Sequence, residues 1–157
     1  LAGEFSPVSL KLVNLTIHLL IAVFIYWLAL GVFRAPVLPS LKNSEVKLAA
    51  FVAAAIWLLH PLHVSTVLYT VQRMAQLSTF FTVLGLCVFM HYRLRWVHRG
   101  ARVGEMLAAG LWLAMITVIA TLSKENGALL PWLVIVVEVV SCRLKQKKIP
   151  VLKTLLV

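Results

Sequence analysis

Apolar and polar positions divide the chain into five long apolar segments separated by short polar connections. Roughly 20 apolar residues is the length that an α-helix needs to cross a bilayer. No internal repeat, low-complexity tract or long linker interrupts the series. The pattern therefore predicts an all-α fold, a polytopic transmembrane helix bundle in which residues 1–157 form a single unit. We expect about five spans, at about 10–33, 46–60, 76–92, 103–122 and 127–142.

The expected spans differ in length. The first is rich in Leu, Ile, Val and Phe, each of which favours insertion by roughly 0.3 to 0.6 kcal/mol, so it should insert unaided. The second and the last are short, and they must tilt little, pack inside the bundle or continue as broken helix. Because a proline biases the preceding residue away from helical geometry, Pro61 is expected to mark a kink or a helix end.

Composition and charge exclude a soluble protein. Apolar residues make up 62% of the chain and charged residues 13%, which leaves too little polar surface for a water-soluble domain of this length. The net charge of +10 would favour nucleic acid in a soluble protein, but here the Lys and Arg residues lie in the connections. We expect membrane lipids with anionic headgroups as partners, and no nucleic acid.

Cysteine usage and the chain ends add two expectations. Cys87 and Cys142 have no metal-binding spacing, so we expect free thiols, no disulfide and no metal site. Because the chain starts at Leu1 rather than Met and turns apolar again over 149–157, we expect a fragment of a longer protein.

Basic residues favour one orientation of the spans. They lie in alternate connections, which the positive-inside rule places in the cytoplasm, with the N-terminus outside. The connections between them are nearly uncharged, so the unusual polar residues of the chain gather on the outer side. The basic groups are Arg34, Lys42 and Lys47, then Arg93, Arg95, Arg99 and Arg102, then Arg143, Lys145, Lys147 and Lys148.

The first expected span carries a polar stripe. Lys11, Asn14 and His18 lie at i, i+3 and i+7, so they share one face of an otherwise apolar helix. The stripe should face protein or a wet cavity. Two interpretations stay open, because such residues either hydrogen-bond a neighbouring helix or contribute to a functional site.

Two further polar motifs follow. His60 and His63 flank Pro61 at the end of the second span, but no Cys or carboxylate lies within motif distance, so a zinc site is discounted. Arg73 lies between apolar stretches, where a lone arginine costs a few kcal/mol unless it finds an anion or the interface. Its guanidinium suits phosphate oxygens, and the alternative is an interfacial arginine that reaches the headgroups.

The fourth expected connection is a tight turn with charges. In one interpretation Ser123 or Asn126 caps the next helix while Lys124 pairs with Glu125, and no ligand is needed. Glu138, near the end of the last span, is expected to be structural and neutralised by basic residues of the following segment. These are Arg143 or Lys145.

Four motifs in series resemble a known membrane family. The chain resembles the polytopic membrane region of the bacterial tetratricopeptide-repeat proteins related to the transmembrane O-mannosyltransferases, which belong to the GT-C class of glycosyltransferases. The resemblance spans nearly the whole chain. The motifs are Val13-Asn14-Leu15 with His18, His60-Pro61-Leu62-His63, Val71-Gln72-Arg73-Met74 and Leu122-Ser123-Lys124-Glu125-Asn126.

The resemblance implies a membrane enzyme that transfers a sugar from a polyprenyl-phosphate carrier to a hydroxyl of an acceptor protein. It implies no cofactor besides that lipid-linked donor, and a location in the bacterial inner membrane with the polar cluster facing the periplasm or exterior. Arg73 and Lys124 are the candidates for phosphate contacts. The other substrate-binding candidates are Asn14, His18, His60 and His63.

The catalytic base is not assigned by this resemblance. The family's acidic residue, typically Asp, lies in an earlier outer loop, and this chain contains no Asp. We therefore expect the base before Leu1 and an inactive chain on its own, with Glu125 ranked second because pairing lowers a carboxylate's pKa. The alternatives are a transporter or flippase subunit for a lipid-linked or anionic substrate, and a non-catalytic membrane anchor.

Overall fold

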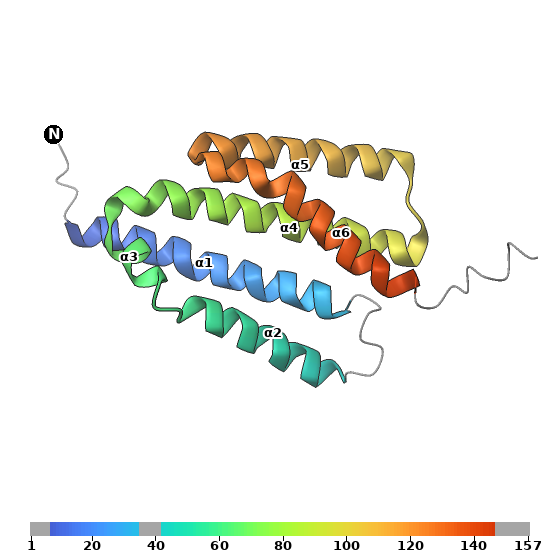
Figure 1. Cartoon of the computed structure of the whole chain (residues 1–157), viewed down its shortest axis with the longest axis horizontal. Helices are drawn as coiled ribbons and strands as arrows, with labels where there is room; N and C mark the ends of the chain where they lie inside the picture. Colours follow the sequence, from blue (N-terminus) through green and yellow to red (C-terminus); the bar gives the residue numbers. More distant parts are fainter. Residues whose placement is uncertain (1–6, 35–41, 147–157) are drawn as a thin grey trace, which may run out of the picture.

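The computed structural model describes residues 7–34 and 42–146, and these residues fold into a bundle of helices (Figure 1). No strand occurs among them, so the predicted all-α fold is confirmed. Three short elements, α3 (His63–Leu68), η1 (Thr70–Gln72) and η2 (Glu125–Leu129), turn the chain between the long helices. The long helices are α1 (Pro7–Arg34), α2 (Asn43–Leu58), α4 (Arg73–Arg99), α5 (Val103–Ser123) and α6 (Leu130–Gln146).

Three helices have the length and composition to cross a membrane. They are α1, α4 and α5, with apolar segments at Val8–Arg34, Arg73–Val97 and Val103–Ser123. Three such helices indicate a membrane-embedded protein. The other two long helices form where spans were expected, but α2 has 16 residues and α6 has 17. The count of five spans therefore stays a prediction.

Several helix boundaries differ from those expected. Helix α4 continues to Arg99 rather than ending near 92, because basic residues are good helix formers and no breaker occurs before Gly100, whose φ of 78° suits glycine. Helix α2 ends at Leu58, as the Pro61 signal predicted. The last expected helix begins as the 3₁₀ turn η2, and the α-helix proper starts at Leu130.

The long helices run between two ends of the bundle (Figure 1), and the residues at these ends differ in charge. The C-termini of α1 and α4 lie at one end with the N-termini of α2 and α5. We call this the basic end, and its described cations include Arg34, Lys42, Arg95, Arg99 and Arg102. At the other end lie α3, η1, η2 and the N-termini of α1 and α4, which we call the polar end. Which side of a membrane each end faces stays a prediction.

Close packing joins α4, α5 and α6. A buried cluster combines Leu86 of α4, Ile116 of α5 and Leu130 of α6. Beside it, a Cβ on Gly85 would lie 2.6 Å from a methyl group of Leu130, so the missing side chain lets α6 approach α4. Dispersion contacts of this kind are the main source of helix association in lipid, where the hydrophobic effect is lost.

An ion pair also joins α4 and α6. Arg93 Nε lies 2.6 Å from Glu138 Oε2, with the two side chains 18% and 37% exposed. The expected partners of this glutamate were Arg143 or Lys145, whose side chains lie outside those that the structure describes, as do Lys147 and Lys148. The partner found is on another helix, because the packing of α6 on α4 brings the two charges together.

Cys87 packs in the interior of α4 against α1. Its thiol donates to the Phe24 carbonyl at 3.2 Å, and it is a free cysteine. The expectation for Cys142 falls on a side chain outside the described ones. These contacts hold the long helices together, and the short elements α3, η1 and η2 form the polar end.

Candidate functional site

Asn14 is the centre of a hydrogen-bond network at the polar end. Its side chain is fully buried on α1. Its Nδ2 donates to the Val67 carbonyl at 3.3 Å and to the Tyr69 carbonyl at 3.4 Å. Its Oδ1 accepts a hydrogen bond of 3.2 Å from Arg73 Nε. The amide therefore connects α1 to the end of α3, to Tyr69 after it, and to the start of α4.

Arg73, the first residue of α4, is half-buried beside Asn14. Besides the bond to Asn14, its Nη2 donates to the Leu10 carbonyl at 3.5 Å. No carboxylate within 7–34 and 42–146 pairs with it. A guanidinium carries five N–H donors, so the neutral oxygens of two α1 residues occupy only part of its capacity. The positive charge is therefore positioned by neutral oxygens, and no carboxylate among the described residues neutralises it.

His18 lies one turn further along α1. It is 5% exposed, and its Nε2 is 3.1 Å from the Leu58 carbonyl. Because a carbonyl only accepts, this nitrogen carries the proton. The ring also packs on Trp57 of α2 and on His63 of α3, with centroid distances of 4.8 and 5.4 Å. His18 thus holds the end of α2 and the start of α3 against α1.

His60 and His63 occupy the turn after α2. The exposed His60 ring accepts the Leu62 N–H at its Nδ1, at 3.3 Å, and its centroid lies 6.0 Å from that of His63. His63 also packs on Trp57 at 4.5 Å. Burial, with smaller contributions from His18 and His60, lowers the pKa of His63 below its ordinary value of 6.5.

The lowered pKa of His63 predicts acid sensitivity of this turn. In the unfolded chain His63 binds a proton near pH 6.5, whereas in the folded protein it resists protonation. The free energy of unfolding is therefore unaffected by His63 above that pH and decreases as the pH falls below it. We expect the thermal midpoint of the purified protein to drop between pH 7.5 and 5.5. We expect His63→Gln to flatten this drop. The control variant His91→Gln, in the half of α4 near the basic end, should retain it. Identical pH profiles for the two variants would contradict the assignment.

Lys124 and Glu125 form a second group at the polar end. The carbonyl of the half-buried Lys124 accepts a 3.4 Å bond from Ser78 of α4, while Glu125 is exposed at the start of η2. The interpretation in which Lys124 pairs with Glu125 is wrong. Among the described residues the salt bridge found is the one between Arg93 and Glu138. The extended backbone of Lys124, with φ −163° and ψ 146°, ends α5 there.

The expected helix cap in this connection is also wrong. The Ser123 hydroxyl donates back to the Ile119 carbonyl at 3.0 Å, within its own helix, and η2 begins after Lys124 without a side-chain cap. Local bonding of a serine to the preceding turn competes with capping, and here it prevails. Asn126 is exposed within η2 and caps nothing.

The structure thus brings together some predicted site residues and leaves others apart. Contacts connect Asn14 with Arg73, His18 with His63, and His63 in turn with His60. Both sets join α1 to the chain between α2 and α4. No hydrogen bond or ion pair among the described residues links them to the Lys124 and Glu125 side chains.

Gln76 was not among the predicted site residues. It lies three residues after Arg73 on α4, is 2% exposed, and neither its Nε2 nor its Oε1 has a hydrogen-bond partner in the described structure. A buried amide without a partner costs about 1 to 3 kcal/mol, so such groups call for an explanation in a binding site or a bound water. The available signal was its i+3 spacing from Arg73 inside an apolar run.

Neither a metal centre nor a known relative identifies this site. Among the described side chains, no group of three or more His, Cys, Asp or Glu is arranged to hold a metal ion. No protein-family model, curated protein or solved structure matches the chain. The resemblance described above therefore depends on the order of the four motifs.

Proposed function

We propose that the polar end binds the phosphate of a polyprenyl-phosphate-linked sugar, and that the chain is the membrane part of a glycosyltransferase that transfers this sugar to a protein hydroxyl. The observation that carries the proposal is Arg73, a half-buried guanidinium held by Asn14 with no carboxylate partner among the described residues. The glycosyl-transfer part depends on the motif resemblance.

An arginine that pairs with no carboxylate of the described residues can stabilise a phosphate that gains charge. In the proposed reaction the acceptor oxygen forms a bond to the anomeric carbon of the sugar, the bond from that carbon to the phosphate oxygen breaks, and polyprenyl phosphate leaves with the electron pair. The acceptor proton passes to a general base. A fixed cation near the leaving oxygens stabilises the transition state more than the ground state. Arg73 is the candidate for this role.

The neighbouring contacts favour a fixed rather than a mobile cation. Asn14 is fully buried and makes three hydrogen bonds, so its Oδ1 is a rigid acceptor for Arg73 Nε. Positioned donors cost no reorganisation when charge develops. Because Asn14 and Leu10 orient one side of the guanidinium, the remaining N–H groups are available to an anion.

The test compares Arg73→Gln with Arg73→Lys in the full-length gene product, reconstituted in nanodiscs. Binding of polyprenyl phosphate and transfer of a labelled sugar from its polyprenyl-phosphate donor are measured separately. We expect Arg73→Gln to lower transfer about 100-fold or more and to weaken binding, and Arg73→Lys to restore part of both. Arg99→Gln removes the same charge at the basic end and should leave both unchanged.

Three outcomes decide between the alternatives. If Arg73→Gln folds normally and binds polyprenyl phosphate as the unmodified protein does, the polar residues serve only to pack the helices together. The anchor hypothesis is then favoured. If binding depends on Arg73 but the unmodified protein transfers no sugar, a lipid-phosphate site without transferase activity remains. If both depend on Arg73, the proposal holds.

A further inference from the structure

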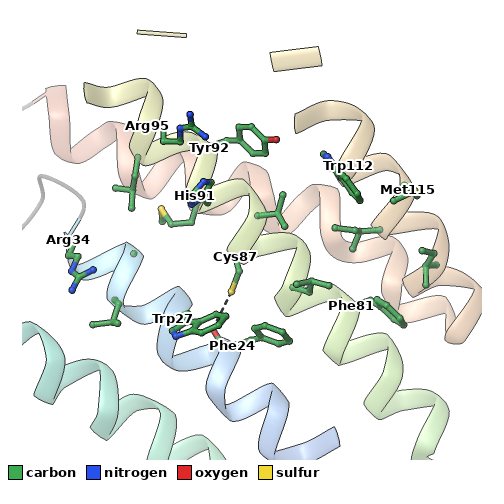
Figure 2. Close-up of a pocket in the computed structure, with 18 residues that line it drawn as sticks. Phe24, Trp27, Arg34, Phe81, Cys87, His91, Tyr92, Arg95, Trp112 and Met115 are labelled. Carbon is green, nitrogen blue, oxygen red and sulfur yellow. Dashed lines mark hydrogen bonds between the residues drawn. The ribbon is translucent and has the colours of Figure 1, made fainter. Parts of the chain in front are cut away.

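A second candidate site lies in the half of the bundle near the basic end. A cavity of about 790 Å³ opens between α1, α4 and α5 (Figure 2). Its volume lies in the range of about 300–1,000 Å³ that is common for small-ligand sites. Trp27 and Trp112 line it and are 56% and 51% exposed, so the cavity opens to the surface of the bundle. The other lining side chains are mostly aliphatic or aromatic and include Phe81, Leu84, Met115 and Ile119.

Two cations line the same cavity where it approaches the basic end of the bundle. Arg34, the last residue of α1, and Arg95 of α4 both belong to its lining and are exposed (Figure 2). Neither forms an ion pair with a carboxylate in the described part of the chain. His91 and Tyr92 of α4 add polar groups near Arg95. The site therefore combines a long apolar compartment with two guanidinium groups that form no ion pair among the residues described.

This combination matches one class of membrane molecule. A glycerophospholipid joins apolar acyl chains to a phosphate, and arginine binds phosphate oxygens in bidentate geometry. Basic pockets between membrane helices are a recognised way to hold anionic headgroups, and Trp and Tyr prefer the depth where chains meet headgroups. An apolar small molecule would use the compartment but not the two charges.

We propose that this cavity binds one anionic glycerophospholipid, with an acyl chain between α1, α4 and α5 and its phosphate at Arg34 and Arg95. Charge complementarity selects this occupant, because the two cations line a cavity whose other side chains are mostly apolar. The site is at the opposite end of the bundle from Arg73, so the inference does not depend on the proposed function.

The charge part is tested with a matched pair of double variants. Arg34→Gln/Arg95→Gln and Arg99→Gln/Arg102→Gln remove the same charge at the same end, but only the first pair lines the cavity. Native mass spectrometry of the purified full chain would measure binding of phosphatidylglycerol and of phosphatidylcholine. We expect the first pair to weaken phosphatidylglycerol binding about 30-fold and the second to leave it within about threefold.

The acyl part is tested by filling the cavity. Met115→Trp adds bulk to the lining on α5, whereas Met106→Trp adds the same bulk on α5 outside it. We expect Met115→Trp to weaken phosphatidylglycerol binding at least tenfold and Met106→Trp to leave it unchanged, with both thermal midpoints retained. Equal binding of the two lipids, equal effects of the two arginine pairs, or no effect of Met115→Trp would each overturn the proposal.

Discussion

Gly127→Ala is expected to destabilise the protein by about 3 kcal/mol or more. Gly127 is buried in η2, and a Cβ at this position would overlap the backbone of Ala120 and Thr121 in α5. A flexible side chain could rotate aside, but backbone atoms inside a helix cannot move without breaking its hydrogen bonds. The turn would have to separate from α5, which would displace Lys124 and Glu125. We expect a large drop in the thermal midpoint in detergent and a lower yield.

The control for Gly127 is Gly110→Ala. Gly110 lies inside α5, and a Cβ built on it meets no atom within 4 Å. Alanine there should be neutral or stabilising by about 0.5 to 1 kcal/mol, because it reduces the freedom of the unfolded chain and favours helix. The two substitutions are chemically identical, so opposite signs would locate the effect in the contact with Ala120 and Thr121. Equal midpoints would contradict the close approach of η2 to α5.

The long helices could be predicted from the sequence because their apolar runs depend on local composition. Helices form at all five expected positions, and the end of α2 before Pro61 follows from a local steric rule. The continuation of α4 to Arg99 was missed, because a hydropathy pattern marks where apolar residues stop rather than where helical hydrogen bonding stops. Likewise, apolar length alone leaves open whether the 16-residue α2 crosses a membrane.

The contacts of the polar end could be predicted only in part. Of the predicted stripe of Lys11, Asn14 and His18, the last two are buried against other helices and Lys11 is exposed. The partners of Asn14 and His18 are the carbonyls of Val67, Tyr69 and Leu58. Every residue carries such a carbonyl, so no residue type signals it. The predicted cap by Ser123 was wrong for a related reason, because the serine hydroxyl can instead donate a hydrogen bond to a carbonyl of its own helix. Non-local contacts require the packed helices to be known.

Asn14→Ala is expected to cost about 2 to 4 kcal/mol, the second large effect. The substitution removes two hydrogen bonds to the carbonyls of Val67 and Tyr69 and the acceptor of Arg73 Nε. The two bonds to carbonyls are long, and hydrogen bonds within membrane bundles average about 0.6 kcal/mol. The bond to a charged donor contributes more, about 1.5 to 3 kcal/mol. Thr16→Ala is the control on the same helix, since Thr16 is exposed and bonds only to Leu12 of its own helix.

A double-mutant cycle isolates the part of this effect that concerns Arg73. If Asn14 positions the guanidinium, Asn14→Ala and Arg73→Gln should be less harmful together than the sum of the single variants, by about 1 kcal/mol or more. The remainder belongs to the two bonds that hold the end of α3 and Tyr69 against α1. A coupling energy near zero would mean that Asn14 does not fix Arg73, and it would contradict a positioned phosphate-binding cation at this site. A clear coupling, with polyprenyl-phosphate binding weakened by Asn14→Ala, would link the fold of the polar end directly to its proposed chemistry.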